Sequence, residues 1–114
     1  MAEAREGWME DYVERVLTAV EAIPPGRVCA YSDIAELLGQ GGPRQVGRVM
    51  AQYGGAVAWW RVVRADGRPV RGLEESALAR LRAENTPLRG DRVDLRLARF
   101  TFPDQDTDLP RNTR

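Results

Sequence analysis

The sequence of 114 residues contains no histidine, no lysine and a single cysteine, Cys29. A catalytic pair of serine or cysteine with histidine, a zinc site with a histidine ligand, a four-cysteine cluster and an internal disulfide all need residues that are absent here. Metal sites built only from carboxylates remain open, but we predict no metal site and no cofactor. Cys29 lies in an apolar stretch without a histidine to act as its base, so we expect an inert, buried thiol.

Long apolar runs are also absent, since the longest one spans five residues, from Ala56 to Trp60. A membrane-spanning helix needs roughly 20 such residues, so we expect no membrane segment. The beginning of the chain carries Glu3, Glu6 and Glu10 and lacks the apolar stretch of a secretory signal peptide. We therefore expect a cytoplasmic monomer that does not contact a membrane.

The formal net charge of the chain is zero, but acidic and basic residues are concentrated in different segments. Residues 1–22 carry six acidic residues and two Arg, whereas residues 23–73 carry seven Arg and three acidic residues. A basic middle segment suits a polyanionic partner on one face of the protein. The alternative is an ordinary pattern of solvated charges.

Apolar residues recur at three- and four-residue intervals near the N-terminus, which predicts an amphipathic helix over residues 6–22. Pro24-Pro25-Gly26 ends this helix, and a short extended segment follows over residues 28–30. The next helix is expected to have Ser32 as its N-cap, acidic residues in its first turn and Gly39 as its stop.

A third helix is expected to open at Gly41-Gly42-Pro43, because proline is tolerated in the first turn. Its inner face should carry Val46, Val49 and Met50. Two short helices joined by a glycine-rich turn outline a helix-turn-helix. Residues 59–64 then have the pattern of a strand, residues 65–68 contain an Asp-Gly turn, and Pro69-Val70 resumes the strand. The fold class predicted is mostly α with a small β wing, a winged helix-turn-helix.

The C-terminal part of the sequence predicts one more helix, over residues 73–84, with Leu78 and Leu81 on its buried side. The residues from Phe102 onward are polar and are expected to be frayed. We therefore predict a single DNA-binding domain over residues 1–102 and a flexible tail over residues 103–114.

The third helix carries the clearest candidates for binding. Arg44 and Arg48 lie four residues apart and off the apolar stripe, with Gln45 and Gly47 beside them, so this face can meet phosphates. Glycine inside a helix costs about 1 kcal/mol relative to alanine, a cost easier to understand where another backbone comes close. The alternative is a solvated helix face with a packing glycine.

Three aromatic residues have a structural and a functional interpretation. Tyr31 precedes the expected N-cap and could be a hydrophobic staple. Trp59 and Trp60 are consecutive, so in a strand they would point to opposite faces, one toward the core and the other toward a surface or pocket.

From Ile23 to about Leu97 the sequence resembles the DNA-binding domain of the O6-alkylguanine-DNA alkyltransferases. The matching pieces, in order, are Ile23-Pro-Pro-Gly-Arg-Val28, Tyr31-Ser-Asp-Ile-Ala35, Arg44-Gln-Val-Gly47, Trp59-Trp-Arg-Val-Val63 with Ala65-Asp-Gly67, and the helix around residues 78–84. In those enzymes the fourth piece reads Pro-Cys-His-Arg-Val, and its Cys takes the alkyl group. Here that place reads Ala58-Trp59-Trp60-Arg61-Val62, which resembles the alkyltransferase-like proteins, relatives that bind the lesion without repairing it.

The resemblance also implies roles for individual residues. The family's histidine is replaced by Trp60 and its asparagine hinge falls near Tyr53, so the whole proton relay is missing and no enzyme activity is expected. Of the Ser-Gly-Gly-Leu stretch that closes the enzyme's pocket only Gly72-Leu73 remains. Arg44 would fill the gap left by the extruded base, and Tyr31 would rotate the 3′ phosphate. The recognition helix in the minor groove would carry Gln45, Gly47 and Arg48, and the lesion pocket would comprise Tyr31, Trp59, Arg61, Val62 and Val63.

Three functions follow from these observations. The first is a non-enzymatic sensor that binds O6-alkylguanine in double-stranded DNA by nucleotide flipping and directs it to nucleotide excision repair proteins. The second is a winged-helix DNA-binding module, regulatory or architectural, without lesion preference. The third is an enzyme that uses Cys29.

Overall fold

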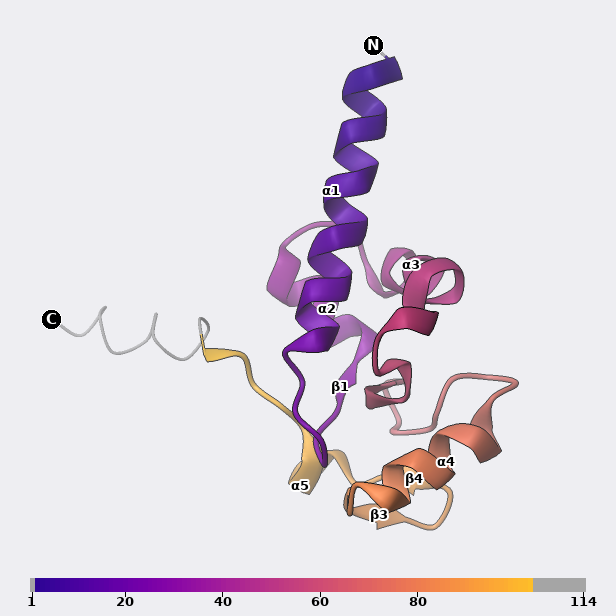
Figure 1. The fold of residues 1–114 in the computed structure, drawn as a ribbon. Helices are drawn as coiled ribbons and strands as arrows, with labels where there is room; N and C mark the ends of the chain where they lie inside the picture. Colours follow the sequence, from indigo (N-terminus) through magenta and orange to yellow (C-terminus); the bar gives the residue numbers. More distant parts are fainter. Residues whose placement is uncertain (1, 104–114) are drawn as a thin grey trace, which may run out of the picture.

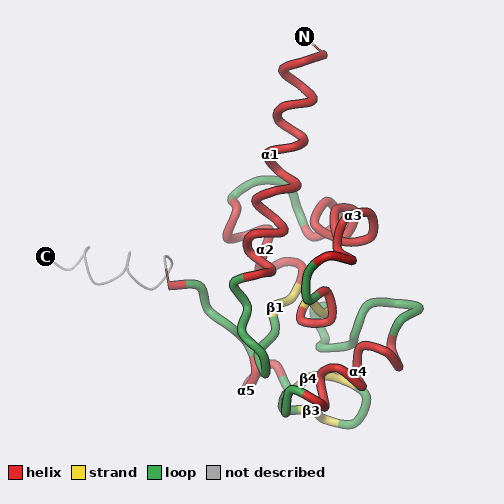
Figure 2. Tube along the Cα trace, viewed as in Figure 1, coloured by secondary structure: helices red, strands yellow, loops and turns green. Residues whose placement is uncertain are grey.

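The computed structural model describes residues 2–103, with side chains from Met9 onward. The structure consists mainly of helices, with four two-residue strands between them (Figures 1 and 2). This confirms the prediction of a mostly α fold with small strands. The elements in chain order are α1 (Ala2–Glu21), β1 (Cys29–Ala30), α2 (Tyr31–Leu38), α3 (Pro43–Tyr53), the 3-10 turns η1 (Gly54–Ala56) and η2 (Trp59–Arg61), β2 (Val62–Val63), α4 (Glu74–Ala83), β3 (Leu88–Arg89), β4 (Arg92–Val93) and α5 (Leu95–Ala98).

The helix-turn-helix formed by α2 and α3 is present where the sequence predicts it. Gly39 ends α2 in the left-handed conformation, with φ 64°, and its N–H donates to the carbonyl of Ala35 at 3.0 Å. Gly42 is the N-cap of α3 and Pro43 its first residue. Helix α1 packs against both helices, and its N-terminal half extends beyond them (Figure 1).

Two apolar clusters hold the fold together. The first joins α1, α2 and α3 through Tyr12, Val16, Ala19, Val20, Ile23, Cys29, Ile34, Ala35, Val46, Val49, Met50, Val62 and Phe102. The second lies under α4 and contains Val28, Val63, Leu78, Leu81, Val93 and Ala98. Strands β1 and β2 pair in parallel, with Cys29 opposite Val62 and Ala30 opposite Val63. In β2 the two side chains divide between the clusters, Val62 in the first and Val63 in the second.

The predicted starts of the first two helices are wrong. Helix α1 begins at Ala2 and not near residue 6, although it ends at Glu21 as expected. Helix α2 begins at Tyr31 and its N-cap is Ala30, so Ser32 does not cap it. The reason is Asp33, whose carboxylate accepts a hydrogen bond from the N–H of Ala30 at 2.9 Å. Asp33 is the third residue of α2, and its bond to the N-cap N–H is the backbone half of a capping box, so it fixes the start of the helix one residue before Ser32.

The predicted wing strand is also wrong in its extent. Only Val62–Val63 of residues 59–64 forms a strand, and Pro69 and Val70 are not in one. The turn at Asp66-Gly67 is present, but it packs against β4: the carbonyl of Gly67 accepts from the N–H of Val93 at 2.8 Å. A Cβ at position 67 would lie 2.4 Å from the Val93 carbonyl oxygen, and φ is +90°, so the turn requires glycine.

The C-terminal part contains structure that the sequence did not predict. Strands β3 and β4 form an antiparallel hairpin, and α5 follows directly. The chain then returns to the centre, where the Phe100 N–H donates to the Val28 carbonyl at 2.8 Å. Phe102 is buried in the first cluster, so the expectation that fraying begins there is wrong. The tail predicted over residues 103–114 lies outside the described residues except for Pro103.

Candidate nucleic-acid interface

Helix α3 presents a basic outer face opposite its buried stripe. Arg44 and Arg48 are exposed, whereas Val46 and Val49 are buried. Pro43–Tyr53 contains no acidic residue, so the positive end of the helix dipole and both guanidinium groups act in the same direction. Gln45 has a local task as well, because its Oε1 accepts from the N–H of Gly42 at 2.9 Å and caps the helix.

Gly47 has no intramolecular reason to be glycine. A Cβ at this position would have no heavy atom within 4 Å, so the structure offers no packing contact that a methyl group would disturb. The alternative of a packing glycine is therefore wrong. The helix accepts a cost of about 1 kcal/mol at a position that is open to approach from outside the molecule.

Tyr31 is the first residue of α2 and not the residue before the cap, so it is no hydrophobic staple. Its ring is half-buried against the first cluster. Burial raises the pKa of Tyr31 above its usual value, against the smaller opposing effect of Arg64. The phenol is therefore neutral at physiological pH and free of a charge that would repel a phosphate.

Trp59 and Trp60 lie in a single 3-10 turn, yet they divide between the two clusters. Trp59 packs against the first and Trp60 against the second. Their rings meet edge to face, 5.7 Å apart between centroids and at 87°. The guanidinium of Arg80 lies 4.8 Å from the centroid of the Trp60 ring and 5.7 Å from that of Trp59. Trp60 is thus a packed residue that supports its neighbour.

A cluster around Glu84 fixes the turn that carries both tryptophans. The Glu84 carboxylate accepts from Trp60 Nε1 at 3.0 Å, from Arg61 Nη2 at 2.6 Å and from the N–H of Gly26 at 3.3 Å. Arg61 also donates to the carbonyl of Ile23 at 2.9 Å. Burial alone would raise the pKa of Glu84, but the hydrogen bonds from Arg61, Trp60 and Gly26 outweigh it and hold the pKa below its usual value.

The side chains of three predicted pocket residues therefore contact other parts of the protein and are not available to a ligand. The Arg61 guanidinium faces Glu84, and the Val62 and Val63 side chains are buried in the two clusters. Val62 and Val63 could therefore contact a ligand only through their backbone atoms. Tyr31 and Trp59 keep part of their rings exposed. Sequence reasoning missed Glu84, because a glutamate at the end of an exposed-looking helix gives no local signal of a partner more than twenty positions away.

Cys29 is fully buried in β1, and its Sγ donates to the carbonyl of Phe100 at 3.4 Å. Burial, reinforced by the negative charge of Asp33, raises the pKa of the thiol to about 12 in spite of Arg99 and this hydrogen bond. The thiolate that nucleophilic attack requires does not form at neutral pH. The predicted burial of the thiol is confirmed, and its lack of reactivity stays a prediction.

Among residues 9–103, whose side chains the structure describes, no three His, Cys, Asp or Glu residues lie together in a way that could hold a metal ion. Over residues 2–103, no helix combines the length and the apolar character needed to cross a bilayer.

Comparison with known proteins decides the family. The sequence profile described as 6-O-methylguanine DNA methyltransferase, DNA binding domain, matches residues 11–86. The chain belongs to this family. The match includes α1 from its middle onward, the helix-turn-helix, the Trp59-Trp60 turn, α4 and Glu84.

Two solved structures and one further sequence are similar to this chain. A crystal structure of S. pombe Atl1 in complex with damaged DNA containing O6-carboxymethylguanine has a TM-score of 0.71 and 25% identity, covering 82% of this chain and 97% of that one. A structure of S. pombe ATL in complex with DNA has a TM-score of 0.62 and 30% identity, covering 70% and 81%. A DNA base-flipping protein of Vibrio parahaemolyticus serotype O3:K6 (strain AQ3810) is 29% identical over 63 residues, which are 53% of this chain. The match spans 63% of the length of that relative.

Proposed function

We propose that this protein is a non-enzymatic sensor that binds O6-alkylguanine in duplex DNA by flipping the damaged nucleotide out of the stack. The observation that carries the proposal is the Trp59-Trp60 pair at the place where the alkyltransferases have Cys-His. The single thiol of the chain, Cys29, is buried with a pKa of about 12 and cannot replace that nucleophile. A chain with this site can recognise an alkylated base but has no group to accept the alkyl.

Helix α3 would supply the contacts to the duplex. Arg44 is exposed at its first turn and would fill the gap left by the flipped base. Gly47 would let the helix backbone approach the groove, and Arg48 would contact a phosphate one turn further along. Tyr31 would rotate the 3′ phosphate at the flipped nucleotide. The open space beside Gly47 and the exposure of both guanidinium groups support this arrangement.

Trp59 would form the wall against which the O6-alkyl group packs. Its ring is held by the first cluster on one side and by Trp60 on another, and Trp60 is in turn fixed by Glu84. A wall that is already rigid loses little conformational entropy when a base packs on it, which favours tight binding. The Glu84 cluster is therefore part of the proposed recognition, although it does not touch the base.

A sensor without chemistry of its own must pass the lesion to other proteins. We propose nucleotide excision repair proteins as the recipients, because these act on distorted DNA and need no direct reversal of the damage. The complexes of S. pombe Atl1 with damaged DNA and of S. pombe ATL with DNA support DNA as the first ligand.

Two duplexes that differ only in O6-methylguanine against guanine test the proposal. Fluorescence anisotropy should show about tenfold or tighter binding to the damaged duplex, since a damaged base costs less to unstack. Trp59→Ala should lower affinity for the damaged duplex by about 1 to 3 kcal/mol, the value of stacking on one aromatic ring. Leu97→Ala, at an exposed position on α5, is the matched control. Equal affinity for both duplexes would favour a winged-helix module without lesion preference, and transfer of a labelled methyl group to the protein would refute the non-enzymatic proposal.

A further inference from the structure

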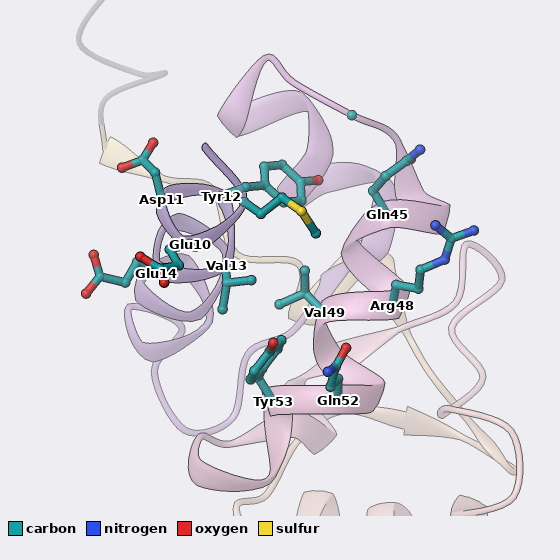
Figure 3. Close-up of a pocket in the computed structure, with 12 residues that line it drawn as sticks. Glu10, Asp11, Tyr12, Val13, Glu14, Gln45, Arg48, Val49, Gln52 and Tyr53 are labelled. Atoms are coloured by element: carbon teal, nitrogen blue, oxygen red, sulfur yellow. The ribbon is translucent and has the colours of Figure 1, made fainter. Parts of the chain in front are cut away.

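A cleft of about 850 Å³ lies between α1 and α3 (Figure 3), and neither Trp59 nor Trp60 lines it. We call it the α1–α3 cleft. Val13 on α1 and Val49 on α3 face each other across it, and Tyr53 closes one end of its floor. Met9 is 55% exposed and Tyr53 is 45% exposed, so two of the large apolar side chains that the described part leaves in solvent converge on this one place. A contiguous apolar surface of this kind marks an interaction site more often than scattered exposed residues do.

The floor of the cleft is firmly built. Tyr12 and Val49 are almost fully buried in the first cluster. Gly41 lines the same cleft, and a Cβ there would lie 2.7 Å from the hydroxyl oxygen of Tyr12, so this glycine lets the ring pack close to the chain. The cleft is therefore a preformed feature of the packed helices and needs no opening step before a ligand can enter.

The α1 bank of the cleft is negatively charged. It carries Glu10, Asp11 and Glu14, all exposed. Figure 3 shows Asp11 and Glu14 extending away from α3, so they form an outer rim beside the apolar floor. None of the three carboxylates forms an ion pair within residues 9–103. The neighbouring cation, Arg15, is turned to Gln40 Oε1 at 2.6 Å and to the Leu38 carbonyl at 2.8 Å, so it does not neutralise the rim.

The apolar floor and the acidic rim together indicate what kind of molecule binds in the cleft. The three carboxylates of the rim repel phosphates and attract cations, whereas Arg48 is the cation on the opposite, α3 side of the cleft. An apolar floor beside unpaired carboxylates suits a helix whose one face is apolar and whose other face carries Lys or Arg. We propose that the α1–α3 cleft is a docking site for a basic amphipathic helix of a partner protein. Gln45 and Arg48, which belong to the proposed DNA-contacting face, also line the α3 side of the cleft, so a docked partner would lie next to a bound duplex.

A defined probe tests the proposal on the full chain. The probe is a fluorescent synthetic peptide of about 16 residues, with Leu at helical spacing and Lys elsewhere, compared with the same peptide carrying Glu for Lys. We expect the Lys peptide alone to bind, to weaken with salt, and to shift the backbone amide signals of Val13 and Tyr53 in the ¹⁵N NMR spectrum. Binding of the Glu peptide with equal affinity, or no binding of either peptide, would overturn the proposal.

Substitutions locate the binding and separate it from other uses of the cleft. Met9→Ser should weaken the Lys peptide about tenfold, as the loss of one central apolar anchor does. Glu10→Gln with Glu14→Gln should weaken it less and flatten its salt dependence. The matched controls are Leu97→Ser, which is 66% exposed on α5, and Glu36→Gln on α2, and both should leave the affinity unchanged.

Two other occupants have their own signatures. A dimer in sedimentation equilibrium that Met9→Ser dissociates would assign the cleft to a second copy of the chain and overturn the proposal. A shift of the Val13 amide by duplex DNA would assign the cleft to the DNA interface, with the same consequence. Met9→Ser should keep wild-type affinity for the damaged duplex, so loss of peptide binding with DNA binding intact separates this proposal from the proposed function.

Discussion

Replacing Gly47 by alanine should change stability and DNA binding in opposite directions. Alanine is favoured over glycine inside a helix by about 1 kcal/mol. The new methyl group meets no heavy atom within 4 Å, so nothing in the protein offsets that gain. For a domain of this size, about 1 kcal/mol corresponds to a rise in melting temperature of roughly 4 to 8 °C.

The same methyl group should weaken DNA binding. If the α3 backbone approaches a groove at Gly47, the Cβ lies in the contact and forces the helix outward. Overpacking of this kind costs about 1 to 3 kcal/mol, or roughly five- to 150-fold in affinity. Thermal unfolding by circular dichroism and anisotropy titrations with damaged and undamaged duplexes measure the two effects on one protein sample.

Gly55 provides the matched control for this prediction. It is exposed in η1, a Cβ there also meets nothing within 4 Å, and its φ is not positive. Gly55→Ala should leave DNA affinity unchanged. A Gly47→Ala protein that is more stable and binds DNA as well as the wild type would refute the argument that the open space at Gly47 exists for DNA. A destabilised Gly47→Ala protein would refute the stability argument.

Arg44→Ala should lower affinity for the damaged duplex by about 1 to 3 kcal/mol, measured by anisotropy, and equal losses for both duplexes would make Arg44 a phosphate contact only. Three to five phosphate contacts predict a slope of log K against log salt of about −3 to −5, and a slope near zero would leave the basic segment without its proposed role. Trp59→Cys should accept no labelled methyl group, because Trp60 supplies no base. Glu84→Gln should cost about 3 kcal/mol in urea unfolding at pH 7, since it removes one partner of a largely buried ion pair, whereas Glu36→Gln should have little effect. Because the folded-state pKa of Glu84 lies below its ordinary value, its stabilising effect is present above about pH 4.5 and is lost as pH falls through the folded value; Glu84→Gln should remove that acid-dependent part.

The elements that the sequence predicted well are those with local signals. Gly39 and Gly41 mark the end of α2 and the turn after it through positive φ angles that few other residues adopt, and Pro43 marks the start of α3 because proline is tolerated in the first turn. The inner faces of α1, α3 and α4 follow from the spacing of apolar residues. In each case the information lies within about one turn of the residue concerned.

What the sequence did not predict depends on residues far apart in the chain. The pattern of residues 59–64 resembles a strand, but the Trp59–Arg61 turn is shaped by Glu84 and by contacts to two clusters. The resemblance places Arg61 in the lesion pocket, and nothing near Arg61 in the sequence indicates that its guanidinium pairs with Glu84. The Ser32 cap failed for a different reason, because two helix-capping signals, Ser32 and Asp33, compete and the structure uses the carboxylate.

The return of the chain to Val28 has a consequence for the order in which the protein folds. The N–H of Val28 donates to the carbonyl of Ala98, and its own carbonyl accepts from Phe100. The loop between Val28 and Ala98 must close before the contacts between its ends can form, and closing it costs conformational entropy. Folding is therefore expected to be slower than that of simple helical bundles. Phe102 completes the cluster that begins at Tyr12 and that packs α1, α2 and α3 together. During synthesis these three helices are therefore not fully packed until the segment around Phe102 has emerged. A growing chain that still lacks this segment therefore has an incompletely packed helix-turn-helix and should bind DNA more weakly than the full chain.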